Sequence, residues 1–168
     1  MYQPGDKVIY GMHGVCIVSD LERRVMDGKP VTYLVLEPAG QSGSRFLVPG
    51  HNAAAMAKVR PVLRAEDLEA LLSSDAVRED AWVREEGQRK QLYRELISSC
   101  DRQRLAQMIH CLYRYRAAQA AIGKKLHMCD ENFLRDAEKI LAGEIASALE
   151  ISSTEALIYL RSKLKEDA

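Results

Sequence analysis

The residues of this chain with the clearest potential for a binding chemistry lie around Trp82, its only tryptophan. If this stretch is helical, the neighbours three and four positions from the ring are all charged: Arg78, Glu79, Glu85 and Glu86. A core tryptophan on an amphipathic helix has apolar residues at those offsets, whereas here the apolar stripe begins only at Leu92. The ring is therefore either covered by another part of the chain or presented to a partner.

Cations close to a flat apolar ring suit nucleic acid, because cations bind phosphates and the ring enters where bases are unstacked. Between Arg84 and Lys125 the chain has ten Lys and Arg against four Asp and Glu, although its formal net charge is zero. A solvated helix face is the alternative, but the excess beside Trp82 favours phosphate contact. The candidate DNA-contacting residues are Trp82, Arg84, Arg89, Lys90, Lys124 and Lys125. No segment resembles a recognition helix with several base-reading side chains, so we expect weak sequence specificity.

The sequence contains no residue pattern typical of catalysis or of metal binding. Its histidines show no ligand spacing, its four cysteines form no CxxC pair, and no Walker, Rossmann or GxSxG pattern occurs. Glu85 and Glu86 are adjacent, so on a helix they would point in different directions and suit acid–base chemistry poorly. We therefore expect no catalytic site, no metal and no cofactor, and we expect the cysteines to be reduced thiols.

Composition fits one medium domain or two small ones. The chain has 168 residues, of which 47% are hydrophobic and 29% charged. No apolar run approaches the roughly 20 residues needed to span a bilayer, and the N-terminus lacks the regions of a signal peptide. We expect a soluble cytoplasmic protein without membrane contact.

The first third of the chain has the pattern of short β-strands. Apolar residues alternate in several runs, and Asp27-Gly28 between two such runs predicts a tight hairpin turn. Four or five short strands without a crossover helix predict a small antiparallel β-barrel of the Tudor/SH3-like kind over residues 1–64.

From Ala65 onward the apolar spacing changes to that of helices. Ser73, Ser74 and Asp75 are possible caps for the segment that contains Trp82, and Asp101 and Asp130 are expected to cap later helices. In the helix after Asp101, the predicted buried stripe consists of Leu105, Met108, Ile109 and Leu112. The last helix is predicted to begin with a capping box from Ser152 to Glu155. The fold class is therefore α+β, with an all-helical bundle of about five helices over residues 65–168.

Several segments together resemble the CarD (CdnL) family of bacterial transcription regulators. They are GDKVIYGMHGVCIV, the hairpin DGKPVTYLVLE, the strand FLVP, Trp82, and the closing FLRDAEKILAGEIA. The resemblance covers nearly the whole chain. It implies that residues 1–64 resemble the RNA polymerase-interacting domain of transcription-repair coupling factor and bind the polymerase β subunit. It also implies that residues 65–168 contact promoter DNA, where Trp82 enters the minor groove at the upstream edge of the bubble and stabilises the open complex.

The resemblance assigns polymerase-binding roles to four residues of the N-terminal part. Arg24 matches an arginine that faces the polymerase, and Met26 matches an apolar contact on the same strand. Leu47 stands where relatives have a second arginine, and Arg45, two positions earlier, shares its face by strand alternation and is a candidate substitute.

In the helical part, the resemblance supports some DNA-contacting positions and weakens others. Arg84 matches a basic residue beside the tryptophan, but Glu85, Glu131 and Asn132 stand where relatives are often basic. Phosphate binding would then depend more on Lys124 and Lys125.

A different class of function remains open. The barrel could be a Tudor-like adaptor for another protein, with Trp82 buried and the helical bundle serving dimerisation without direct DNA contact. For the transcription regulator, we expect a monomer.

Overall fold

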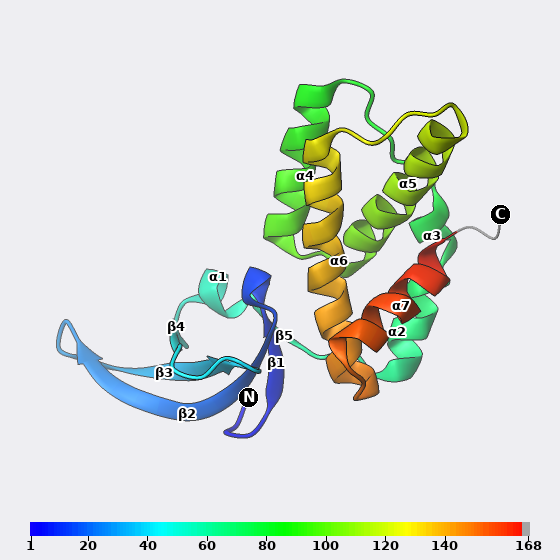
Figure 1. The fold of residues 1–168 in the computed structure, drawn as a ribbon. Coiled ribbons are helices and arrows are strands. Elements are labelled where there is room, and N and C mark those ends of the chain that lie inside the picture. The colour runs from blue at the N-terminus through cyan, green and yellow to red at the C-terminus, as the bar shows by residue number, and fades with distance from the viewer. Residues whose placement is uncertain (166–168) are drawn as a thin grey trace. The chain divides into compact units, whose positions relative to one another are not determined.

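The computed structural model describes residues 1–165, which divide into two compact units with the boundary between Val62 and Leu63. The expected α+β class is confirmed: an antiparallel sheet is followed by helices (Figure 1). None of the described helices is long and apolar enough to cross a membrane.

The N-terminal unit is built on a five-stranded antiparallel sheet with the strand order β4-β3-β2-β1-β5. Its strands are β1 (Lys7–Tyr10), β2 (Val15–Met26), β3 (Lys29–Pro38), β4 (Phe46–Pro49) and β5 (Val59–Pro61). A 3-10 turn, η1 (Gly11–His13), follows β1, and a single helical turn, α1 (Ala53–Met56), follows β4. The sheet is strongly curved, but β4 and β5 form separate edges, so the expected barrel is not closed (Figure 1).

The predicted hairpin turn at Asp27-Gly28 is confirmed. Met26 pairs with Lys29, which leaves a two-residue loop in which Asp27 has φ 51° and Gly28 has φ 75°. Two positive φ values match the twist of the flanking strands, and Asp-Gly adopts them at low cost. This turn closes the β2–β3 hairpin, which extends as a long arm from the rest of the sheet (Figure 1).

The helical unit contains six helices within the described residues, where about five were expected. They are α2 (Ala65–Leu72), α3 (Asp75–Arg78), α4 (Glu86–Ser99), α5 (Arg102–Ala121), α6 (Met128–Leu149) and α7 (Ser153–Leu164). The buried stripe of α5 and the capping box at Ser152 are as predicted.

Two predicted helix boundaries are wrong, and both corrections concern the site. The single helix expected around Trp82 is divided into α3 and α4, because Glu79 has an extended backbone and Glu85 caps α4 by accepting from Gly87 N and Gln88 N. Helix α6 begins two residues before Asp130, so this carboxylate lies in the first turn and not at the cap.

Candidate nucleic-acid and polymerase interfaces

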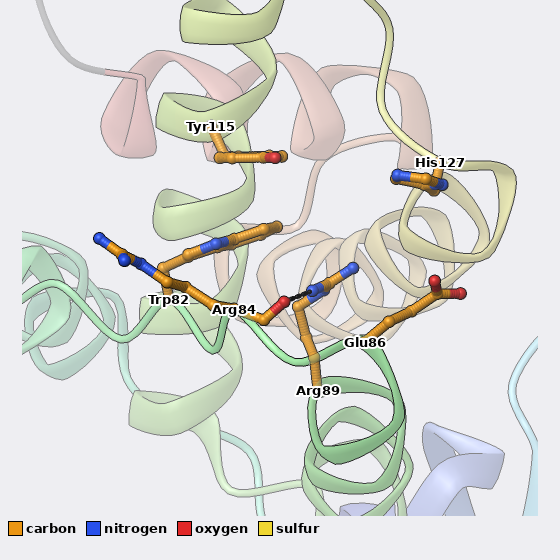
Figure 2. Close-up of a pocket in the computed structure, with 6 residues that line it drawn as sticks. All are labelled: Trp82, Arg84, Glu86, Arg89, Tyr115 and His127. Atoms are coloured by element: carbon orange, nitrogen blue, oxygen red, sulfur yellow. Dashed lines mark hydrogen bonds between the residues drawn. The ribbon is translucent and has the colours of Figure 1, made fainter.

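Trp82 lies in the non-helical segment between α3 and α4, so helical spacing does not decide which side chains lie next to its ring. Its ring stacks on Tyr115 of α5, with 3.7 Å between the ring centroids and 18° between the planes. On the other side of the indole, the Arg89 guanidinium carbon lies 4.5 Å from the ring centroid (Figure 2). The ring is half-buried and packs against the helical core, yet it is not enclosed.

Arg89 is almost fully buried, with 3% of the residue exposed. Its Nε and Nη2 donate to the two carboxylate oxygens of Asp130 at 3.0 and 2.9 Å. Its Nη1 donates to the backbone carbonyls of Val83 and Arg84 at 3.0 and 3.2 Å. The hydrogen bonds that Arg89 donates to Asp130 are the main reason that the pKa of Arg89 is raised. Arg89 was expected to contact phosphate, but its Nε, Nη1 and Nη2 groups already donate to partners inside the unit.

An open recess of about 490 Å³ lies beside the indole ring. It is lined by Trp82, Arg84, Glu86, Arg89, Tyr115 and His127. Figure 2 shows the Arg84 side chain extending away from His127 and Glu86, which lie at the opposite end of the group. The recess thus presents an aromatic edge between groups of both charge signs.

The other expected cations differ in how available they are. Arg84, Lys124 and Lys125 are exposed, and the two lysines lie in the loop that leads to His127 at the start of α6. Lys90 Nζ, by contrast, lies 2.5 Å from Glu86 Oε1 one helical turn away. Within the described residues, three of the sequence-predicted cations are therefore exposed, one is paired at the surface and one is buried.

Two acidic residues close to the recess are held in their charged form. The backbone N–H groups of Gln88 and Gly87 lower the pKa of Glu85, as expected for a carboxylate at a helix N-terminus. The hydrogen bond with Lys90 lowers the pKa of Glu86. The N-terminus of α4 therefore adds negative charge next to Trp82, which opposes phosphate binding there.

The sequence analysis missed three residues of this site: Tyr115, Asp130 as a partner of Arg89, and His127. Tyr115 follows Leu112 by three positions and so continues the buried stripe of α5, which is a signal that the sequence contained. The pairing of Arg89 with Asp130 spans 41 positions, and no local pattern indicates it.

In the N-terminal unit, the strand register places three of the four residues expected to bind polymerase on one face of the sheet. Val35 lies opposite both Asp20 and Leu47, and Arg24 and Met26 follow Asp20 at even spacing along β2. Because partners across a ladder share a face, Arg24, Met26 and Leu47 lie on the same side. The buried cluster that includes Val8, Cys16, Leu34, Leu36 and Val48 lies on the other side.

The residues expected to bind polymerase are exposed, and most of them contact neighbouring side chains of the sheet. The side chain of Arg24 is 51% exposed, and its Nη2 lies 2.7 Å from Glu22 Oε2. Arg45 lies immediately before β4 and pairs with Glu37 of β3 at 3.0 Å. Tyr33, which the sequence analysis did not single out, contacts both the Met26 sulfur and the Arg24 guanidinium.

Both units match known protein families. Residues 2–62 match the family described as CarD-like/TRCF RID domain, and residues 68–161 match the CarD C-terminal domain. The chain belongs to the CarD family. CarD proteins are transcription factors, not enzymes, and the N-terminal match is to an RNA polymerase-interacting domain. The chain is therefore a transcription-related regulator of the kind that binds RNA polymerase.

Proposed function

We propose that this CarD-family protein stabilises the open promoter complex. The N-terminal unit would dock on the polymerase β subunit through the face that contains Arg24, Met26, Arg45 and Leu47. The helical unit would place the edge of Trp82 in the minor groove at the upstream edge of the bubble. Such a regulator would act as a monomer in the bacterial cytoplasm, associated with the nucleoid through polymerase, and would need no cofactor.

The observation that supports this proposal best is the state of the Trp82 ring. Tyr115 and Arg89 hold it on both sides, and its edge borders an open recess. An apolar wedge that contacts only melted DNA lowers the free energy of that state without helping the closed state. A base step that is already partly unstacked costs least to separate, so the bubble edge is the best place for the ring.

The phosphate contacts are assigned to Arg84, Lys124 and Lys125, which are exposed. These three cations do not form the set of base-reading side chains that a recognition helix presents. Promoter choice would therefore come from the polymerase. Arg89 supports the ring, and Lys90 contributes only when Glu86 releases it.

The lifetime of open complexes tests the role of Trp82. One aromatic contact with a base is worth roughly 1–3 kcal/mol, so Trp82→Ala should shorten that lifetime several-fold or more. Binding of the variant to polymerase should remain normal. An unchanged lifetime with a folded variant would exclude the wedge and favour a protein-interaction adaptor without DNA contact.

Docking on polymerase is tested by reversing one charge on the proposed face. Arg24→Glu should weaken binding of the full-length protein to the β subunit by more than about tenfold, or roughly 1.4 kcal/mol. Arg23→Glu is the matched control, because Arg23 is the exposed neighbour on β2 whose side chain lies on the other face, opposite Thr32. Equal weakening by both variants would indicate a nonspecific charge effect.

A further inference from the structure

The guanidinium of Arg89 connects several parts of the helical unit that are distant in sequence. It extends from α4, forms a two-point hydrogen-bonded pair with Asp130 of α6, and donates to the carbonyls of Val83 and Arg84. Its guanidinium carbon also lies over the Trp82 ring, 4.5 Å from the ring centroid. One buried side chain therefore contacts both the backbone beside the tryptophan and the indole itself.

We propose that Arg89 and Asp130 form a positioning pair that fixes the orientation of Trp82 for its contact with the bubble edge. The inference rests on the proposed function of Trp82 as a wedge. Segment 79–84 lies outside the helices and strands, so its conformation depends on side-chain contacts such as these. A ring that is ordered before binding loses less conformational entropy when it meets DNA.

The chemistry of the pair suits positioning better than simple stabilisation. A buried ion pair is often no more stabilising than apolar residues of similar size, because both charges lose their hydration. The planar fork of arginine, however, bonds a carboxylate at two points and stacks on an aromatic face at the same time. A lysine at this position keeps the charge but cannot make the fork, the two carbonyl contacts and the stacking together.

The chain contains a matched pair for comparison. Arg102 and Glu144 join α5 to α6 with Nε 2.5 Å from Oε2, and their side chains are 14% and 3% exposed. Arg102 is the first residue of α5, so it lies about 20 Å along the helix from Tyr115. Weakening this pair changes a buried arginine–carboxylate contact of the same unit without altering the surroundings of Trp82.

The test uses Trp82 as its own reporter, since the sequence has no other tryptophan. In full-length Arg89→Lys, acrylamide quenching of Trp82 should increase and its fluorescence anisotropy should fall, while thermal unfolding remains cooperative. Open complexes formed with polymerase holoenzyme on a linear promoter fragment should be several-fold shorter-lived than with the unaltered protein. Arg102→Lys should leave quenching, anisotropy and lifetime unchanged even if it lowers the melting temperature as much.

Asp130→Asn is the second variant, and it provides the same comparison if Arg89→Lys does not fold. Unchanged quenching and lifetime in a folded variant of the pair would overturn the positioning role, and so would equal changes in Arg102→Lys. A normal lifetime with Trp82→Ala would instead refute the wedge function, and the fluorescence of the pair variants would still decide whether they orient the ring.

Discussion

Trp82 combines two properties that a wedge into DNA requires, a defined orientation and an accessible edge. Stacking on Tyr115 and the contact with Arg89 provide the orientation, because both neighbours belong to helices of the core. The half-buried state of the ring provides the edge. The same contacts mean that the ring also contributes to folding, so stability and function must be measured separately.

Replacing Trp82 should cost less stability than replacing a core aromatic residue. An emptied core site of this size costs roughly 3–5 kcal/mol, whereas the partly buried ring of Trp82 should account for about 1–2 kcal/mol in Trp82→Ala. Urea unfolding at neutral pH measures the difference. A loss in the full core range would mean that the ring is chiefly structural and that its loss of function follows from misfolding.

Removing one member of the buried pair should be far more damaging than removing both. Arg89→Met leaves Asp130 buried and without its guanidinium, which typically costs about 3–5 kcal/mol. The double variant Arg89→Met/Asp130→Leu should recover much of this loss, because no unpaired charge is then buried. A double-mutant cycle by urea unfolding checks the coupling. Purely additive losses would show that the two side chains act independently.

At the level of elements, the hairpin, the α5 stripe and the capping box were predictable because each is encoded by neighbouring residues. The division between α3 and α4 was not, because Glu85 is an uncommon cap and the charged stretch around it suits a helix equally well. Asp130 was predicted to be a cap because it precedes an apolar run. In the structure it lies in the first turn of α6 and accepts a hydrogen bond from buried Arg89. The sequence thus singled out Trp82 and Arg84, which line the candidate recess, but it contained no signal for the contacts that span the fold.

The turn of the β2–β3 hairpin gives a test at the scale of this element. Gly28 has φ 75°, a conformation that a β-branched residue adopts only at a cost of roughly 1–3 kcal/mol. Gly28→Val should therefore loosen the arm that contains Arg24 and Met26, and weaken binding to polymerase. Titration against the isolated β subunit measures this, with Gly28→Asn as control because asparagine tolerates positive φ. Equal affinity of the two variants for the β subunit would show that the conformation of this turn does not affect docking.

At the scale of the whole molecule, buried tyrosines predict how stability changes in alkali. Burial raises the pKa of both Tyr93 and Tyr113 above the ordinary value of a phenol. Above about pH 10 the unfolded chain releases these protons while the folded chain keeps them, so stability should fall as the pH rises further. Below about pH 10 both tyrosines are protonated in the folded and the unfolded chain, so their contribution to the free energy of unfolding is fully present.

Tyr93→Phe should flatten this alkaline decline, since phenylalanine has no proton to lose. Among the described residues, the Tyr93 hydroxyl has no hydrogen-bond partner, so the substitution should change the free energy of unfolding at neutral pH little. Tyr113 donates to Glu138, so Tyr113→Phe should cost stability at neutral pH as well. The free energy of urea unfolding, measured across the alkaline range, distinguishes the two variants. Parallel pH profiles for Tyr93→Phe and the unaltered protein would contradict the assignment.

The distribution of charge over the molecule predicts the salt dependence of DNA binding. The chain is neutral overall, so affinity should come from the three exposed cations Arg84, Lys124 and Lys125 and should be low. Two or three phosphate contacts give a slope of log affinity against log salt of about −2 to −3, and Lys125→Ala should reduce its magnitude by about 1. Lys90→Ala should change the slope less, because Glu86 already engages that ammonium group.

Glu86→Gln provides the opposite change, because it removes a negative charge from the recess and releases Lys90 for phosphate. This variant should bind a forked promoter fragment more tightly than the unaltered protein, with a steeper salt slope. Glu95→Gln, further along α4, is the control, and its effect should be smaller because screening reduces interactions beyond about 10 Å. If Glu86→Gln and Glu95→Gln increased affinity equally, net charge and not the surface beside Trp82 would govern binding. If neither altered it, phosphate contacts would not be made from this side of the helical unit.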